Sequence, residues 1–272
     1  LIASLFFACR TSRKTVVALL PFIIFGISYD WMNIVHNYDV NPVDIRGLYE
    51  AEKSLFGITA ATGEVLTPNE FFARHTSTLM DILGGFFYLC WVPVPIFFGL
   101  YLYFGRQVKI YLHFAIVFLL VNLIGFAGYY IHPAAPPWYV ALYGFDFIEG
   151  TPGSVAGLGH FDEITGLGIF NGLYGRNSNV FAAVPSLHSA YTLVAFIYSI
   201  RAKCPAWIRV ALAVITLGIW FTAVYTSHHY IIDVALGILC AITGYLLFEY
   251  LLMRIPAVAR FLDLYTAYVT PR

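Results

Sequence analysis

The sequence contains few charged residues. Only 11% of its 272 residues are Asp, Glu, Lys or Arg, whereas 60% are hydrophobic, and the mean hydropathy is +0.76. A soluble fold of this composition would have too little polar surface to cover its core. The formal net charge is zero, so nothing in the composition suggests a nucleic-acid partner. The sequence therefore predicts an integral membrane protein.

Cysteine is also scarce, and its four copies form no CxxC pair. They lie in separate apolar segments, at Cys9, Cys90, Cys204 and Cys240. This pattern is typical of small buried side chains rather than of a disulfide or zinc framework. No internal repeat or second domain is evident. We therefore expect residues 1–272 to form one all-α, membrane-embedded domain.

Long apolar runs account for most of the chain. A helix needs roughly 20 apolar residues to cross the hydrocarbon core of a bilayer. This rule predicts six transmembrane helices, near residues 16–35, 79–104, 109–131, 186–201, 206–226 and 231–253. Six spans would place both termini on the same side of the membrane.

The basic residues divide unequally between the two sides. The termini and short loops of one side contain 11 of the 15 Lys and Arg residues, although the loops of the other side are far longer. The longer loops contain only Arg46, Lys53, Arg74 and Arg176. Because positive residues favour the cytoplasmic side, we predict cytoplasmic termini. Loops 36–78 and 132–180 and the turn 227–230 would then face the periplasm, the cell exterior or an organelle lumen.

Short helices are expected within the outward loops. Asn41-Pro42 begins a predicted interfacial helix that ends at Gly57, with proline in the first turn and glycine at the end. Thr67 and Glu70 have capping-box spacing, which predicts a helix start before the second span. The glycine-rich 132–180 loop is long enough that, if ordered, it is expected to be functional.

Two outward segments carry the candidate catalytic residues. The sequence AVPSLHSA (183–190) precedes the fourth span, and SHHYIID (227–233) precedes the sixth. Both spans run inward, so both helix N-termini face the same side, where free amides and the helix dipole favour an anion such as phosphate. The hydroxyl of Ser186 is placed to bind phosphate oxygens as well.

His229 and Asp233 are four residues apart and therefore share a helix face. A carboxylate in this position holds one imidazole nitrogen and leaves the other free as a nucleophile. His188 is then the general acid and base, because the ordinary pKa of imidazole lies near neutrality. This constellation predicts phosphoryl transfer through a phosphohistidine on His229.

Other interpretations of the histidines remain open on spacing alone. His188, His228, His229 and Asp233 are also compatible with a metal site. His228 points in a different direction from its neighbour His229 on a helix, so we treat it as secondary. The remaining histidines are interpreted as interfacial hydrogen-bonding residues. These are His36, His75, His113 and His160.

These segments resemble the type 2 phosphatidic acid phosphatase superfamily of membrane lipid phosphatases and phosphotransferases. Pro185, Ser186 and His188 match its proline-serine-x-histidine signature, and His229 and Asp233 match its final histidine-x-x-x-aspartate motif. The resemblance implies six spans, His229 as nucleophile oriented by Asp233, His188 as general acid, and no metal or other cofactor.

The chain departs from the family pattern where the phosphate-binding cations are expected. Gly125 replaces a lysine, His132-Pro133 replaces arginine-proline, and Thr222-Ala223 replaces serine-arginine. We expect Arg176, the only basic residue of the 132–180 loop, to take over phosphate binding with help from His132.

The stretch HPAAPPWY (132–139), together with both motifs, is similar to the branch that contains inositol phosphorylceramide synthase. This resemblance implies transfer of phosphoinositol from phosphatidylinositol to ceramide or dihydroceramide, with release of diacylglycerol. The compact chain favours a bacterial member. The alternative is a phosphatase of lipid phosphates or isoprenyl diphosphates that uses the same site. A non-catalytic lipid transporter or scaffold is disfavoured, because binding alone does not require the intact histidine and aspartate set. The oligomeric state is not indicated.

Overall fold

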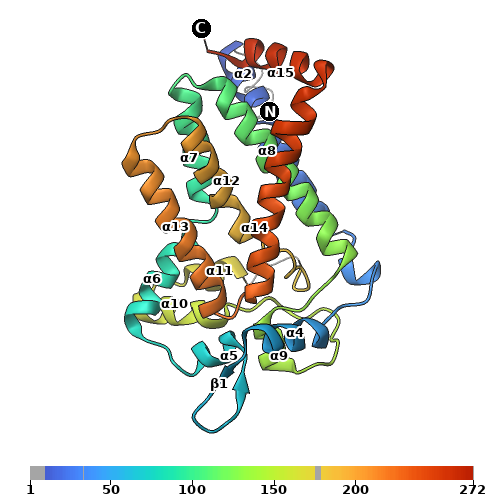
Figure 1. Cartoon of the computed structure of the whole chain (residues 1–272), viewed down its shortest axis with the longest axis vertical. Helices are drawn as coiled ribbons and strands as arrows, with labels where there is room; N and C mark the ends of the chain where they lie inside the picture. The colour runs from blue at the N-terminus through green and yellow to red at the C-terminus, as the bar shows by residue number, and fades with distance from the viewer. Residues whose placement is uncertain (1–9, 33, 175–178, 272) are drawn as a thin grey trace.

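The computed structural model describes residues 10–32, 34–174 and 179–271, and it is dominated by helices along one long axis (Figure 1). The longest are α8 (Val108–Ile131), α12 (Leu187–Arg201), α13 (Ala206–Tyr225) and α14 (Ile231–Leu246). A π-helical turn (Leu247–Leu251) and a 3-10 turn (Leu252–Arg254) extend α14. The remaining long-axis helices are α3 (Leu20–Trp31), α6 (Thr78–Leu89) and α7 (Pro93–Phe104).

The two ends of this bundle differ. At one end α2 (Arg10–Ala18) contacts α15 (Pro256–Val269), so the N-terminal and C-terminal helices lie together (Figure 1). At the other end lie short elements from the loops. These are α4 (Arg46–Phe56), α5 (Pro68–Ala73), α9 (Pro137–Tyr143), α10 (Gly159–Thr165), α11 (Ile169–Tyr174), two 3-10 turns (Asn37–Asp39 and Ala156–Leu158), and the antiparallel pair β1 (Ile58–Thr59) and β2 (Val65–Leu66).

Three helices are long and apolar enough to cross a membrane by length and composition: Val108–Ile131, Ala206–Tyr225 and Ile231–Arg254. Helices α6 and α7 pass the same test only as a pair, which is bent by 44° at the break between them. Helix α3 has 12 residues and α12 has 15, fewer than a straight span needs. Within the described residues, the structure thus contains three candidate spans, or four if the bent pair is one span. The six-span topology stays a prediction.

The predicted span 79–104 is broken at Cys90–Val92 for a local reason. Pro93 and Pro95 lack the amide hydrogen that would continue the helical ladder, and in a continuous helix the ring of Pro93 would clash with the carbonyl of Leu89, the last residue of α6. The chain therefore ends α6 and starts α7 in a new direction. The break brings Trp91 to the interior of the bundle, where it contacts His188.

The short outward helices agree only in part with the sequence. The capping box predicted at Thr67 is confirmed, because its hydroxyl accepts from Glu70 and the Glu70 carboxylate accepts from the amide of Thr67. Helix α4 begins at Arg46 rather than at Asn41, so that predicted start was wrong. Asp44 instead pairs in extended form with Ala134, through hydrogen bonds to neighbouring backbone groups. The α15 helix was not predicted.

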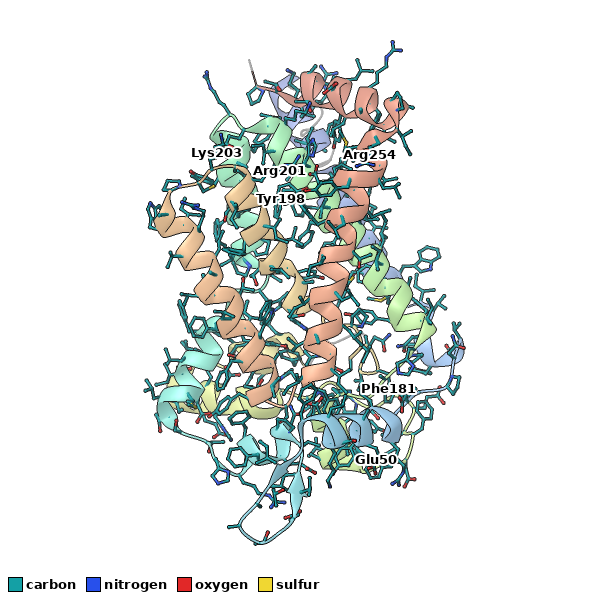
Figure 2. The ribbon with its side chains drawn as sticks, viewed as in Figure 1. Glu50, Phe181, Tyr198, Arg201, Lys203 and Arg254 are labelled. Carbon is teal, nitrogen blue, oxygen red and sulfur yellow. The ribbon has the colours of Figure 1, made fainter. Side chains whose placement is uncertain are left out.

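Charge is distributed along the bundle axis as the sequence suggested. Figure 2 shows Arg201, Lys203 and Arg254 toward the end that carries α2 and α15, with Glu50 and Phe181 toward the opposite end. A buried core centred on α8 lies between the two ends, and α8 packs against α3, α7, α12 and α14. Both predicted catalytic segments start at the end that carries α4 and α9 (Figure 1).

Candidate active site

His188, His229 and Asp233 lie in a row at the start of α12 and α14. The Nδ1 atom of His188 is 3.0 Å from the Nε2 atom of His229, and the Nδ1 atom of His229 is 3.4 Å from Oδ2 of Asp233. Asp233 is fully buried, and His229 is 5% exposed. The structure thus brings together the three residues that the sequence selected.

The order of contacts suggests where the ring hydrogens lie. The Nδ1 atom of His229 faces the Asp233 carboxylate at 3.4 Å without forming a hydrogen bond of good geometry. A ring hydrogen on Nδ1 leaves Nε2 as the acceptor in the contact with His188, and its electron pair becomes available when the His188 ring moves away. Burial lowers the pKa of His229 to about 4, so this ring is neutral at pH 7. A neutral ring with its Nε2 electron pair available is the form that a nucleophile requires.

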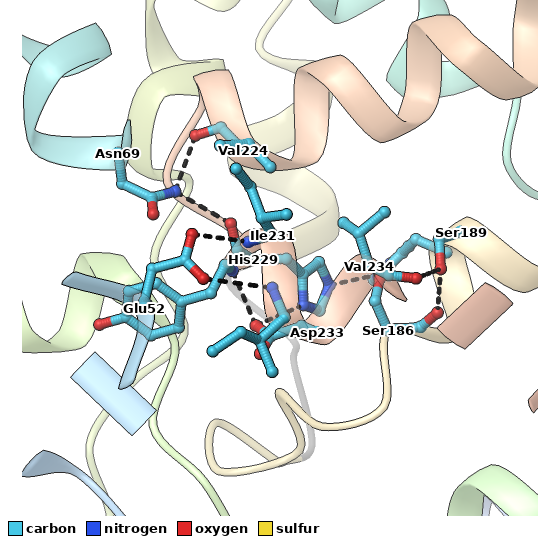
Figure 3. A network of polar contacts seen from close by, with 12 residues as sticks. Glu52, Asn69, Ser186, Ser189, Val224, His229, Ile231, Asp233 and Val234 are labelled. Atoms are coloured by element: carbon cyan, nitrogen blue, oxygen red, sulfur yellow. Dashed lines mark hydrogen bonds and ion pairs between the residues drawn. The ribbon is translucent and has the colours of Figure 1, made fainter. Parts of the chain in front are cut away.

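Backbone and hydroxyl contacts tie the two helix starts together (Figure 3). The amide of Ser186 donates to the carbonyl of Asp233 at 2.9 Å. The hydroxyl of Ser189 donates to the carbonyl of Ser186 at 2.7 Å and lies 3.2 Å from the carbonyl of Val234. The contacts with Asp233 and Val234 cross from the start of α12 to α14, so they fix the position of His188 relative to His229.

Three glycines make this close approach possible. On α14, a Cβ atom at Gly237 would collide with the carbonyl oxygen of Ser186. On α8, a Cβ atom at Gly125 would meet the side chain of Leu187, and one at Gly128 would meet Pro185. Gly125 is the position where the family has a lysine. The structure therefore gives a physical reason for this departure, since the start of α12 occupies the space that a side chain would need.

The buried carboxylate of Glu52 on α4 caps the start of α14. Its Oε1 and Oε2 atoms accept from the amides of Ile231 and Ile232 at 2.9 and 3.2 Å (Figure 3). Asp233 accepts from the amide of Tyr230 at 2.8 Å. The expectation that free amides at this helix N-terminus bind phosphate is therefore wrong for α14, because protein carboxylates already hold them. Burial raises the pKa of Glu52 above its ordinary value.

Asn69 on α5 positions the turn that carries His229. Its side-chain amide donates to the carbonyls of Val224 and His229 at 2.8 and 2.9 Å (Figure 3). Sequence reasoning missed both Asn69 and Glu52. The only local signal was the capping box around Asn69, which predicted the helix α5 but not its contact with the distant segment 224–229.

Aromatic residues cover the other side of His188. The ring of Trp91 lies edge-on to His188 with centroids 4.6 Å apart, and it also stacks on Tyr191 at 5.8 Å. Beyond Tyr191 is a cavity of about 330 Å³ between α3, α7, α8 and α12. Apolar side chains dominate its lining, including those of Phe22, Phe118 and Ile96. An apolar space therefore lies within a few side chains of the histidine pair.

The other predicted site residues have different positions. Ser186 is buried next to the site, and its Oγ atom has no hydrogen-bond partner. His132 is about half-exposed and pairs with Asp44, with Nε2 and Oδ2 3.3 Å apart. His228 is buried and bonds to Thr226 rather than to His188. Arg176 lies outside the described residues.

One histidine interpreted as interfacial is part of the core instead. His113 is buried, and its Nδ1 atom lies 2.8 Å from the Glu249 carboxylate. Arg201 and Tyr198 bind the same carboxylate. The prediction for His113 was therefore wrong, because Glu249, a buried acid in the π-helical turn that follows α14, supplies a partner that sequence spacing did not indicate.

Within the described residues, the structure has no group of three or more His, Cys, Asp or Glu side chains arranged to hold a metal ion. The Nδ1 atom of His228 contacts Thr226, and its Nε2 atom has no hydrogen-bond partner. The arrangement of His188, His229 and Asp233 is instead suited to supply a nucleophile, a proton carrier and an orienting carboxylate. These are the groups that acyl or phosphoryl transfer through a covalent intermediate needs.

The chain is similar to proteins of a known family. The model of the PAP2 superfamily matches residues 63–247. The chain is 61% identical over 265 residues to the phosphoinositol dihydroceramide synthase of Bacteroides thetaiotaomicron, covering 97% of this chain and 87% of that relative.

Fungal relatives are more distant. The chain is 26% identical over 228 residues to the catalytic subunit of inositol phosphorylceramide synthase from Saccharomyces cerevisiae. That match covers 77% of this chain and 49% of the yeast protein, so the chain spans about half the length of this relative. No solved structure matches the fold of this chain.

Proposed function

The chain belongs to the PAP2 superfamily, and we propose that it transfers phosphoinositol from phosphatidylinositol to the hydroxyl of a ceramide or dihydroceramide, releasing diacylglycerol. The observation that carries this proposal is the row formed by His188, His229 and Asp233. The substrates follow from the extensive similarity to a relative named phosphoinositol dihydroceramide synthase.

In the first step, the Nε2 atom of His229 attacks the phosphorus of phosphatidylinositol. The bond between phosphorus and the diacylglycerol oxygen breaks, and His188 gives its proton to that oxygen. Asp233 stabilises the positive charge that develops on the His229 ring. The product is a phosphoinositol group on His229 and free diacylglycerol.

In the second step, His188 accepts the proton of the ceramide hydroxyl. The hydroxyl oxygen attacks phosphorus, and the bond between phosphorus and His229 breaks. The free imidazole of His229 is regenerated, so no group is consumed besides the two lipids. No step of this sequence requires a metal, and we propose that the reaction is metal-independent.

The partners of the basic residues in the outward loops also favour a phosphodiester donor, because they leave few cations for phosphate. Arg74 pairs with Glu64, Arg46 lies over the ring of Phe145, and Lys53 bonds to Tyr49. These three cations are already engaged, and His132 also has a carboxylate partner in Asp44. Arg176 remains as the proposed phosphate contact, which His132 would join by releasing Asp44. A phosphodiester carries a single negative charge, whereas the phosphomonoester substrate of a phosphatase carries more and would need more cations.

The apolar cavity supports lipid substrates. It lies in the part of the bundle that we propose to be inside the bilayer, and Tyr191 and Trp91 separate it from His188. A hydrocarbon chain in this cavity would leave its head group near the histidine pair. In the proposed topology, the end that carries α2 and α15 is cytoplasmic and the active site faces the other side.

The proposal is tested with purified protein, head-group-labelled phosphatidylinositol, and ceramide added or omitted. The expected result is a new labelled lipid only when ceramide is present, with the same yield in the presence of a chelator. Release of water-soluble label without ceramide would identify a hydrolase instead. Loss of activity in chelator that added metal restores would contradict metal-independence.

A further inference from the structure

A second group of polar side chains is buried beside His188, outside the row that performs the transfer. It consists of Tyr88 at the end of α6, Tyr174 at the end of α11 and His228 in the turn before α14. Tyr88 is fully buried, and His228 is 5% exposed. The hydroxyls of Tyr88 and Tyr174 lie near each other. Neither makes a hydrogen bond of good geometry, and the Nε2 atom of His228 has no partner either.

The hydrogen bonds of His228 determine what its free nitrogen can do. The Thr226 hydroxyl donates its single hydrogen to the carbonyl of Thr222 at 2.7 Å. The Nδ1 atom of His228 lies 3.1 Å from that hydroxyl oxygen and 3.2 Å from the carbonyl oxygen of Thr226. Because both oxygens can only accept here, Nδ1 carries the ring hydrogen. The Nε2 atom of His228 is therefore a buried acceptor without a donor.

The three side chains are in contact with one another and with the reaction centre. The rings of Tyr88 and His228 have centroids 5.3 Å apart, and those of Tyr174 and His228 are 4.7 Å apart. Tyr88 also stacks on the ring of His188 at 5.2 Å. Only the ring of His188 would separate a group bound here from the phosphorus on which His188 and His229 are proposed to act.

The chemistry of the cluster limits what it can bind. A buried polar atom without a partner is costly, so these atoms are expected to be satisfied by a ligand. Burial and the neighbouring His229 keep the pKa of His228 well below its ordinary value, so its ring is neutral at pH 7. A neutral set of one acceptor and two hydroxyls matches a ligand rich in hydroxyl groups. It offers no cation for a phosphate and is too polar for a hydrocarbon chain.

We propose that Tyr88, Tyr174 and His228 form the subsite that binds the hydroxyl groups of the polyol head group on the donor lipid. The Nε2 atom of His228 accepts from one head-group hydroxyl, and the two tyrosine hydroxyls donate to or accept from others. Tyr174 is partly exposed, so the proposed subsite is accessible from the side of the outward loops. The identification of the polyol as inositol rests on the proposed function.

The subsite is tested by binding rather than by turnover. Protein in nanodiscs is titrated with short-chain phosphatidylinositol and with short-chain phosphatidylethanol, a phosphodiester of the same charge without head-group hydroxyls. The full-length protein is expected to prefer phosphatidylinositol. His228→Phe and Tyr174→Phe should each reduce this preference about tenfold, the effect of losing one well-formed hydrogen bond, without weakening phosphatidylethanol binding.

Two further variants separate recognition from folding. His228→Gln keeps an acceptor near the Nε2 position and should retain part of the preference that His228→Phe loses. Tyr143→Phe removes a hydroxyl from a partly buried tyrosine of α9 and should leave the preference unchanged. An unchanged preference in both His228→Phe and Tyr174→Phe would overturn the subsite. If instead the preference depends on these residues but no labelled ceramide product forms, the subsite stands and the proposed transfer reaction fails.

Discussion

The Nδ1 atom of His188 lies 3.0 Å from the Nε2 atom of His229, so the two imidazole rings proposed for catalysis are hydrogen-bonded to each other. A phosphorus atom with its oxygens does not fit within this distance. Substrate must therefore displace the His188 ring before His229 can attack. His188 is partly exposed whereas His229 is buried against Asp233, so the His188 ring is the one expected to move.

The first prediction concerns the covalent intermediate. His229→Ala should abolish acid-labile labelling of the protein by head-group-labelled phosphatidylinositol, because it removes the attacking nitrogen. His188→Ala should still be labelled, about 100-fold or more slowly, since general acid catalysis contributes on that order. The measurement is label retained on denatured protein over time. Undiminished labelling of His229→Ala would remove it as the nucleophile.

The second prediction concerns pH. An unfolded histidine titrates near 6.5, whereas burial holds the pKa of His229 at about 4. Between these values the folded protein binds fewer protons than the unfolded chain, so stability should decline as pH falls from about 6.5 to about 4. Labelling of His229 should persist down to about pH 5 and then decrease as the nucleophile is protonated.

Thermal unfolding and the labelling rate are measured together across this pH range. The same profile in Asp233→Asn tests whether the carboxylate contributes to the acid limb. A labelling rate that already halves near pH 6.5 would show that the His229 ring titrates as an exposed histidine does, against its burial in the structure.

The third prediction concerns Glu52, which accepts from two amides at the start of α14. Glu52→Gln keeps one acceptor oxygen but turns the other into a donor that faces an amide. The resulting unsatisfied pair is expected to cost about 1–3 kcal/mol of stability and to lower activity by displacing His229. Glu50→Gln on the same helix is the matched control, because Glu50 is exposed and its contact with Arg46 is weak.

The readouts are the thermal transition and the transfer rate of each variant, measured in the same detergent. Equal behaviour of Glu52→Gln and Glu50→Gln would show that the cap on α14 does not position the site.

The fourth prediction concerns the glycine contact between α12 and α14. Gly237→Ala places a methyl group against the carbonyl of Ser186, so the helix starts must separate and His188 must move from His229. We expect transfer to fall at least tenfold, since small misplacements of catalytic groups have large effects. Gly84→Ala on α6 is the control, because a Cβ atom there would meet Thr222 only at 3.4 Å, an ordinary van der Waals contact. Full transfer activity in Gly237→Ala would contradict a requirement for this close approach.

The fifth prediction concerns the apolar cavity, which Gly26 lines. Gly26→Trp is expected to fill part of this space, since a Cβ atom at Gly26 meets no atom within 4 Å. If a lipid chain occupies the cavity, KM for long-chain ceramide should rise, whereas KM for a short-chain ceramide should change little. Assays with the two acceptors at fixed phosphatidylinositol measure this difference. An equal change for both chain lengths would argue against a chain in the cavity.

Local patterns in the sequence determined much of this protein. Long apolar runs predicted the helices α8, α13 and α14, because burial of their side chains in lipid or protein does not depend on distant residues. The four-residue spacing of His229 and Asp233 placed both on one helix face, and the motif around His188 selected its partner. The prolines in the second predicted span did not by themselves predict its break, since many membrane helices tolerate proline without breaking.

Only the tertiary structure decided which groups surround this set. Glu52 lies 179 residues from Ile231 in sequence, yet its carboxylate holds the helix amides that had been expected to bind phosphate. Tyr88 at the end of α6 contacts His188. Because Gly125 and Gly237 have no side chain, Leu187 can approach the first and the carbonyl of Ser186 can approach the second. Such contacts join segments that are far apart in the sequence, so no local pattern predicts them. The sequence therefore selected the residues proposed to react, and packing decided their environment.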